Sequence, residues 1–299
     1  MSADLTPHPA ASPAQRPGAD GHALALASGL DALQTEPSRS QRRTVKRTAA
    51  PLIALTSALA LWQLAYTLRT PSGLVSPRAV ASELLTLWQH GILLPALGHS
   101  LQRCAAGFTA SAVIGSALGL IIHRYTSPRT ALAPVLSALQ SLPASALVPP
   151  AVIMLGESET AVYTVVLLGA VPSTAMGLVS ALDQIPPLLR RAGTTMGATG
   201  LRAVRRVLLP AALPGLIAAL RQGWTFGWRA LMTAELITAT PLPGIGRILN
   251  TGRQDNNLTL VIAAVTVTLA VGVLTEVLIF APAERRILHK RGLGAQYSR

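Results

Sequence analysis

The sequence predicts an all-α integral membrane protein with six spanning helices, and three observations support this fold class. Half of the 299 residues are hydrophobic and only 12% are charged, whereas soluble domains carry roughly 25% charged residues. The mean hydropathy is +0.46. Six apolar stretches are long enough, at about 20 residues each, to cross roughly 30 Å of hydrocarbon. These stretches are residues 49–68, 100–122, 131–155, 160–182, 212–238 and 258–281.

The positions of the basic residues predict the orientation of the chain. The formal net charge of +13 would indicate a nucleic-acid partner in a soluble protein. No basic stripe with interleaved aromatic residues occurs, so no nucleic-acid partner is expected. With the N-terminus inside, 18 of the 25 Lys and Arg residues fall in cytoplasmic segments, which satisfies the positive-inside rule. The outside segments hold Arg69, Arg78, Arg103, Arg247 and Arg253.

This orientation predicts one membrane domain, residues 49–285, with both termini in the cytoplasm. Residues 1–48 are rich in Ala, Pro and Ser and end in the basic run "RSQRRTVKR", so they are predicted to form a disordered basic cytoplasmic tail. The apolar run "ALALA" in this tail is too short for a cleavable signal peptide. Residues 286–299 are predicted to form a second cytoplasmic tail.

Two of the spans have informative interiors. The second repeats a small residue at every fourth position, which lets another helix approach closely. The third contains three prolines, which predict a kinked helix. The small residues are Gly107, Ser111, Gly115 and Gly119, and the prolines are Pro143, Pro149 and Pro150.

Several classes of function are excluded or disfavoured. A Walker A loop needs a Gly-Lys-Ser or Gly-Lys-Thr sequence, and the only lysines are Lys46 in "VKR" and Lys290 in "HKR". The chain has one cysteine, Cys104, and six scattered histidines, so neither a metal site nor a cofactor is expected. A stand-alone secondary transporter or channel for a small anion remains an alternative, as does a non-transporting membrane scaffold.

A basic loop, residues 183–211, connects the fourth and fifth spans, and we call it the knuckle. Its core reads "RRAGTTMGATGLRAVRRVLLPAALPG". We expect one short helix over 187–196, a sharp turn at Gly197, and a second helix over 199–208 that "LLP" (208–210) ends. Pro214 is expected to mark the entry to the fifth span.

The knuckle resembles the cytoplasmic signature of permease subunits of ATP-binding-cassette (ABC) importers. That signature is Glu-Ala-Ala, three residues, Gly, nine residues, Ile, one residue, Leu-Pro. The matching residues are Arg191, Ala192, Gly193, Gly197, Val207, Leu209 and Pro210. Other segments are similar to permeases of nitrate, sulfonate and taurine importers, namely "HSLQRCAAGF" (99–108), "LPASALVPPAVIMLG" (142–156), "TAEL" (233–236), "PGIGRIL" (243–249) and "APAERRIL" (281–288).

The resemblance implies a type I, MetI-like six-helix permease in a bacterial inner membrane. Two permease chains, as a homodimer, would form the pathway for a small anion of the sulfonate, taurine or nitrate type. Two copies of an ABC ATPase subunit would dock on the knuckles, and a periplasmic or lipid-anchored solute-binding protein would deliver the solute. The signature's acidic position is Arg191 here, so we expect the ATPase to carry acid near its docking cleft.

Three charged residues fall within the fifth span: Arg221, Arg229 and Glu235. A charge near the middle of a bilayer costs about 2.5–3.5 kcal/mol on insertion scales, so it faces a cavity or a partner. Arg229 is the nearest to the centre. One interpretation is a translocation pathway for an anion. The other is a structural ion pair, with Glu276 or with a second copy of the chain.

Overall fold

A computed structural model describes residues 53, 56–68 and 75–290. The chain divides into two compact units, Met1–Thr67 and Leu68–Arg299. In the first unit, residues 56–67 are helical, in agreement with the predicted first span. The predicted tail 1–48 lies outside the described residues, as do residues 291–299 of the second tail.

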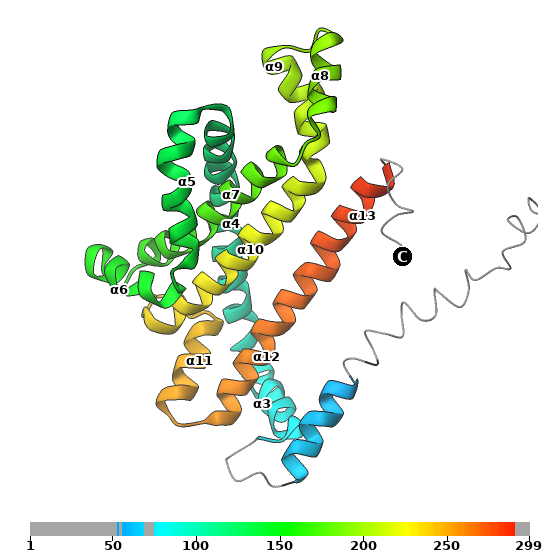
Figure 1. Ribbon diagram of the computed structural model, residues 1–299. Helices are drawn as coiled ribbons and strands as arrows, with labels where there is room; N and C mark the ends of the chain where they lie inside the picture. Colours follow the sequence, from blue (N-terminus) through cyan, green and yellow to red (C-terminus); the bar gives the residue numbers. More distant parts are fainter. Residues whose placement is uncertain (1–52, 54–55, 69–74, 291–299) are drawn as a thin grey trace, which may run out of the picture. The chain divides into compact units, whose positions relative to one another are not determined.

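The described residues of the second unit form helices and their connections, without a strand (Figure 1). The α-helices before the knuckle are α3 (Pro77–Gln89), α4 (Leu93–Arg124), α5 (Thr126–Ser141), α6 (Ala144–Leu155) and α7 (Glu159–Asp183). The knuckle contains α8 (Pro187–Thr195), α9 (Gly200–Ala203) and the π-helix η1 (Val204–Leu208). The rest comprises α10 (Leu209–Ile237), α11 (Ile245–Gln254), α12 (Leu258–Thr275), the π-helix η2 (Glu276–Phe280) and α13 (Ala281–Lys290).

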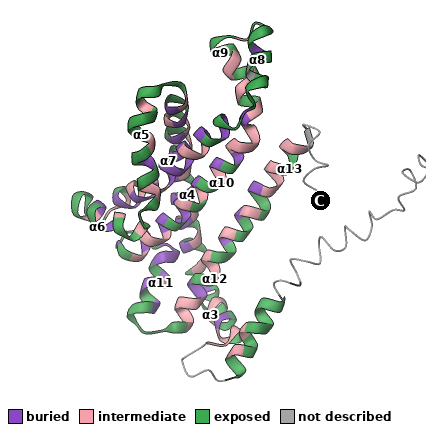
Figure 2. Ribbon diagram, viewed as in Figure 1, coloured by how far each residue is buried: buried purple, intermediate pink, exposed green. Residues whose placement is uncertain are grey.

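Helix α7 is the centre of the packing. It packs most extensively against α10 and then against α4, and 61% of its most apolar stretch is buried, against 28% for α4. In Figure 2 the buried residues follow α7 and the sides of its neighbours that face it. Small residues allow these close approaches: a Cβ on Gly177 would lie 2.7 Å from the Cβ of Ala219 on α10.

The four small residues of α4 are buried. Three of them lie directly against α7. A Cβ on Gly107 would lie 2.7 Å from Val166, one on Gly115 would lie 2.8 Å from Thr174, and one on Gly119 would lie 2.8 Å from the carbonyl oxygen of Ala175. The hydroxyl of Ser111 donates back to the carbonyl of Gly107, 2.7 Å away, so it leaves no unpaired polar group on this face.

The predicted third span is broken rather than kinked. Helices α5 and α6 meet at an angle of 102°. Leu142 has an extended conformation, with ψ 133°, which is the conformation that a residue before proline favours. Pro143 follows it as the N-cap residue of α6. The prolines at 149 and 150 lie inside α6.

The predicted end of the second knuckle helix at 208–210 is wrong. The chain remains helical from Gly200 to Ile237, and Leu208–Pro210 lie within it. The amide of Leu209 donates to the carbonyl of Val204, five residues back. The wider π turn gives room for Pro210, whose ring clashes with a carbonyl in an ordinary α turn. Pro214 also lies inside the helix.

Length and composition permit several of the described helices to cross a membrane. Helices α4 and α7 and the continuous helix Leu258–Leu288 each meet this test, and the bent α5–α6 pair makes a fourth. Helix α10 has 29 residues, about 43 Å at 1.5 Å per residue, and holds the three charges identified in the sequence. On α4, α5, α6, α12 and η2 many large apolar side chains are exposed, as a lipid-facing surface requires.

Candidate functional site

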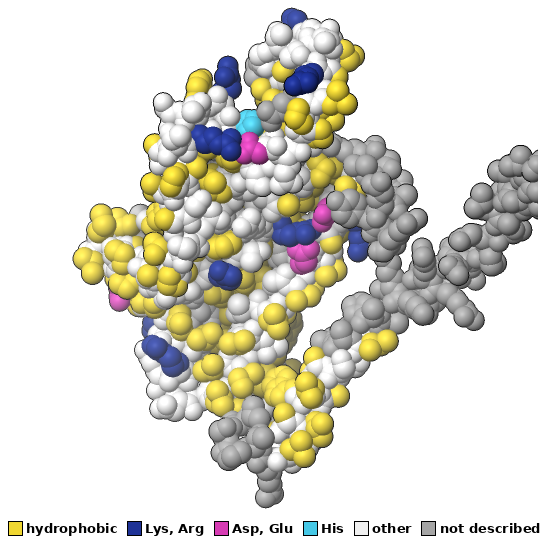
Figure 3. All heavy atoms as spheres, viewed as in Figure 1, with side chains coloured by type: hydrophobic (Ala, Val, Ile, Leu, Met, Phe, Trp, Pro, Cys, Tyr) yellow, Lys and Arg dark blue, Asp and Glu magenta, His cyan; other side chains and the backbone are white. Residues whose placement is uncertain are grey.

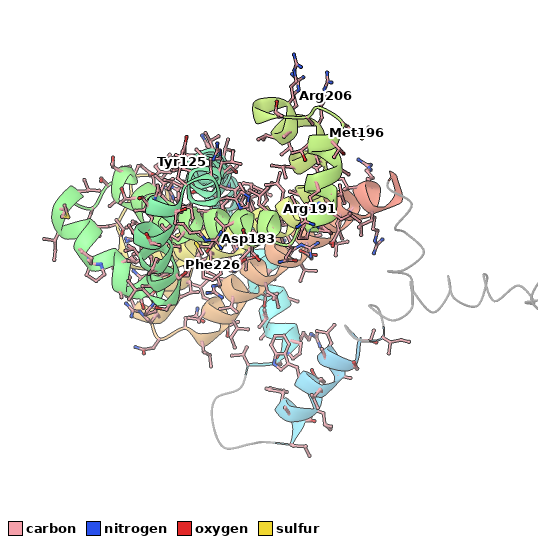
Figure 4. The ribbon with its side chains drawn as sticks, turned by 45° about the horizontal axis from the view of Figure 1, so that its top comes forward. Tyr125, Asp183, Arg191, Met196, Arg206 and Phe226 are labelled. Carbon is pink, nitrogen blue, oxygen red and sulfur yellow. The ribbon has the colours of Figure 1, made fainter. Side chains whose placement is uncertain are left out.

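The knuckle projects its residues away from the packed helices. Helix α8 ends one residue earlier than predicted, at Thr195, and the predicted turn at Gly197 is confirmed by a φ of +77°. Such a φ favours glycine because other residues are strained there. Figure 4 shows Arg191, Met196 and Arg206 on the projecting part of the knuckle, apart from Asp183 at the end of α7 and Phe226 on α10.

Two of the signature residues pack against each other. Gly193 is buried, and a Cβ placed on it would lie 2.9 Å from Cγ2 of Val207. The signature has alanine at this position, and here the valine side chain occupies the space that the alanine methyl group would need. Helix α8 and η1 are therefore held together at the residues that the signature pattern selects.

The exposed surface of the knuckle combines apolar and basic side chains. Met196 is 86% exposed and Leu188 is 77% exposed. The arginines at positions 191, 202, 205 and 206 are also exposed. The sequence contains no acidic residue between Asp183 and Glu235. This surface suits an acidic partner that has an apolar slot.

Arg221 is paired with two glutamates of the C-terminal helix. Its Nε lies 3.3 Å from Oε2 of Glu276, and its Nη2 donates to Glu284. The pairing with Glu276 that the sequence allowed for Arg229 is thus made by Arg221. These contacts join α10 to η2 and α13.

Arg229 is exposed on α10 and has no acidic partner within 4.0 Å among the described residues. Its guanidinium lies over the ring of Phe226, 4.8 Å from the ring centre. It lines a groove of about 570 Å³ between α10 and α12. Trp224 and Trp228 also line this groove, with their rings parallel and 6.5 Å apart. Figure 3 shows one face of the protein, where basic (blue) and acidic (magenta) side chains form small groups among hydrophobic ones (yellow).

Glu235 is enclosed rather than exposed to a cavity. It is 2% exposed. The hydroxyl of Ser100 donates to both of its oxygens, at 2.7 and 3.0 Å, and Nη1 of Arg103 donates at 2.9 Å. The amide of Gly246 donates at 3.1 Å. A side chain on Gly244 would collide with the Glu235 carboxylate, so the loop closes over this group only with glycine.

Arg103 makes a second set of contacts that the sequence did not predict. Its Nε donates to Glu159 at 2.6 Å, and Nη2 donates to the carbonyl of Leu242 at 2.7 Å. Arg103, expected in a connecting segment outside, lies instead within α4 and is 3% exposed. The sequence feature that could have predicted these contacts is a cation inside an apolar span, because such a cation needs a buried counter-ion.

Three of the segments that resemble importer permeases meet at the contacts of Arg103, Ser100 and Glu235. These segments are residues 99–108, 233–236 and 243–249. The contacts tie the start of α4 to the end of α10, to the loop before α11 and to the first residue of α7. We call Arg103, Ser100 and Glu235, with Glu159, the buried charge cluster. Its role is structural in this conformation, since every charged group in it is paired.

A bundle of apolar helices with a projecting basic knuckle defines a multi-pass membrane transport subunit. Residues 111–287 match the family "Binding-protein-dependent transport system inner membrane component". The match spans more than half of the chain, and the chain belongs to this family.

Relatives of known role have similar sequences. The taurine transport system permease protein TauC of Escherichia coli (strain K12) is 28% identical over 231 residues, which cover 73% of this chain and 81% of TauC. The nitrate import permease protein NrtB of Synechocystis sp. is 29% identical over 196 residues, 62% of this chain and 71% of NrtB. The bicarbonate transport system permease protein CmpB of Synechococcus elongatus is 28% identical over 177 residues, 59% of this chain and 63% of CmpB.

Among solved structures, a chain of the MetNI methionine ABC transporter in an inward-facing conformation has a similar fold. The TM-score is 0.50 at 24% sequence identity, and the match covers 62% of this chain and 92% of the other. The predicted MetI-like helical fold is thereby confirmed.

Proposed function

We propose that this chain is the permease subunit of an ABC importer for a small oxoanion, driven by ATP hydrolysis on a separate subunit. The observation that carries the proposal is the knuckle, which presents the spaced signature residues on α8 and on the start of the continuous helix Gly200–Ile237 that packs against it, in a chain of this family. Taurine, nitrate and bicarbonate, the solutes in the relatives' names, all contain an oxoanion group.

The partners follow from this proposal. An ATPase subunit would dock on the knuckle, with two copies serving two permease chains in a homodimer. A periplasmic or lipid-anchored solute-binding protein would supply the solute from the other side of the membrane. Closure of the ATPase pair would move both knuckles, and the continuous helix Gly200–Ile237 would carry that motion into the bundle as a rigid lever.

Docking can be tested by purification from membranes. The wild-type chain is compared with Gly197→Pro, because proline cannot adopt the φ of +77° at this position. Gly91→Pro is the matched control, since Gly91 also has a positive φ, of 66°, but lies between α3 and α4. We expect mass spectrometry to identify an ABC ATPase with the wild type and the control, and to find it lost with Gly197→Pro. Purification of the wild type alone would instead favour a stand-alone transporter or channel.

The anionic character of the solute rests on Arg229. It is exposed on α10, eight residues before that helix ends, without an acidic partner among the described residues, and a cation within a span attracts an anion. Arg221 and Glu235, the other two candidates for the pathway, are engaged in the ion pairs described above.

A further inference from the structure

A polar cavity of about 350 Å³ lies among helices α5, α7 and α10. Three glutamines and a serine line it: Gln140 of α5, Ser180 of α7, Gln184 at the end of α7, and Gln222 of α10. Its floor is the close crossing of α7 and α10, where Gly177 lies against Ala219 and Gly215 lies against Ala181. No charged residue lines it.

Much of the hydrogen-bonding capacity in this cavity is unused. Nε2 of Gln184 donates to the hydroxyl of Ser180 at 2.9 Å. The side chains of Gln140 and Gln222 make no hydrogen bond within the part of the chain that the structure describes. Gln140 is half-buried and Gln222 is exposed.

Unpaired amides are costly on a surface that faces lipid, where no water satisfies them. Polar side chains within membrane-crossing helices therefore face an aqueous cavity or another protein surface. The surface formed by α5, α7 and α10 is therefore expected to face water or a second protein rather than lipid in the assembled transporter. The groove beside α12, in contrast, is lined mainly by apolar side chains.

A positive charge lies near this cavity along α10. Gln222 and Arg229 are seven residues apart, nearly two turns, so they lie at similar angles on the helix and about 10.5 Å apart along its axis, although Arg229 itself lines the groove beside α12. Arg229 is exposed at that point. An anion at Arg229 would therefore be about 10.5 Å from Gln222 along the helix axis.

We propose that the cavity lined by Gln140, Ser180, Gln184 and Gln222 is a transit site that binds an oxoanion through neutral N–H and O–H donors. Each glutamine amide offers two N–H donors, which suit the several oxygens of such a group. A transit site has to release its solute again, and neutral donors hold an anion less tightly than an arginine does. This inference rests on the proposed function and adds the chemistry by which the solute is recognised inside the bundle.

The first test measures uptake by the complete transporter, reconstituted in vesicles with its co-purified ATPase and binding protein, using radiolabelled taurine and nitrate as probes. Gln222→Glu preserves the shape of the side chain but adds a negative charge, so we expect uptake to fall by roughly tenfold or more, since like charges placed side by side repel. Gln89→Glu, exposed on α3, is the matched control and should transport normally.

Equal uptake by Gln222→Glu and wild type would overturn the transit site, whereas failure of the wild type to bind an ATPase would count against the proposed function itself.

The second test needs no ATPase. Cys104 is the only cysteine and is fully buried, so Cys104→Ala provides a background for single cysteines. We expect Gln222→Cys and Gln140→Cys to react in membranes with 2-sulfonatoethyl methanethiosulfonate, a charged, water-borne thiol reagent. Leu278→Cys, on an exposed apolar surface of η2, should react at least tenfold more slowly, because lipid excludes the charged reagent, as roughly estimated from the cost of a charge in hydrocarbon. Labelling of all three at equal rates would show that the glutamine surface is not a distinct aqueous path, and would overturn the inference.

Discussion

Arg103 shares its charge between two carboxylates, one fully enclosed and one partly open. Glu235 is enclosed, while Glu159 has a side chain that is 34% exposed. Removing one partner of an enclosed ion pair leaves an uncompensated charge, which destabilises a protein by about 3–5 kcal/mol. The two carboxylates are therefore expected to differ in their contribution to stability.

Arg103→Met should accordingly be severely destabilised, by about 3–5 kcal/mol, because Glu235 loses its cation. Glu159→Gln should lose much less, since water reaches that carboxylate. The measurement is thermal unfolding of the purified protein in detergent. Arg78→Met, on exposed α3, is the control, and the double variant Arg103→Met/Glu235→Gln should recover part of the loss. A single Arg103→Met variant as stable as wild type would disprove the buried charge cluster.

At Gly193, helix propensity and packing oppose each other. Alanine is better than glycine inside a helix by up to about 1 kcal/mol, yet its methyl group would meet Val207. We expect Gly193→Ala to gain little or to destabilise in the wild-type background and to stabilise in a Val207→Ala background. Thermal unfolding of the two single variants and the double variant gives the coupling energy, for which residues in contact show roughly 0.5–3 kcal/mol. Additive effects would mean that the two residues do not pack together.

The residues of the site were predictable to different degrees. Arg229 and Glu235 were conspicuous in the sequence because charges are rare in apolar spans. Their surroundings were not predictable, since Ser100 and Arg103 precede Glu235 by more than 130 positions and only the fold brings them together. The glutamines of the polar cavity give no signal in sequence, because each stands alone in its own helix.

The helices themselves follow the sequence pattern closely, and the departures occur at prolines. Pro143 was expected to bend the third span and instead divides it, with Leu142 in the extended conformation that the position before proline favours. Pro210 was expected to end a helix, and a π turn accommodates it. Hydropathy and glycine positions predict where helices cross and turn, but the response of a helix to proline depends on the neighbours that satisfy its backbone.

Helix α10 offers a comparison of two arginines on one element. Arg221 is tied to Glu276 and Glu284, whereas Arg229 is exposed without an acidic partner in the described residues. We expect Arg229→Gln to lower anion uptake by about tenfold, the size of a lost charge contact worth 1–2 kcal/mol. Arg221→Gln should leave uptake nearly unchanged while lowering the unfolding temperature slightly. Uptake in reconstituted vesicles distinguishes the two, and a larger loss with Arg221→Gln would assign the pathway to the other end of α10.

At the scale of the whole molecule, the charge pattern and the fold make one consistent arrangement. The basic residues lie mainly in the tails and the knuckle, which the positive-inside rule assigns to the cytoplasm. This orientation remains a prediction, and it places the knuckle where an ATPase is available. The polar surface of α5, α7 and α10 requires water or a second protein against it, and the assembled transporter would supply one of these.

The absence of acid from residues 184–211 of the knuckle also predicts how it binds its partner. Four exposed arginines and no carboxylate in these residues give a single-signed surface, so binding to an acidic cleft should weaken as salt is added, since screening at 0.1 M acts over about 10 Å. Arg191→Glu should lower the affinity for the ATPase by about tenfold at low salt and reduce the salt dependence. Met196→Ala, which removes an exposed apolar contact, should lower affinity without changing the salt dependence. The measurement is the affinity for the ATPase, obtained by titration in detergent at two salt concentrations. Tighter binding by Arg191→Glu would mean that the cleft of the ATPase is basic. The arginine at this position of the signature would then weaken docking instead of contributing to it.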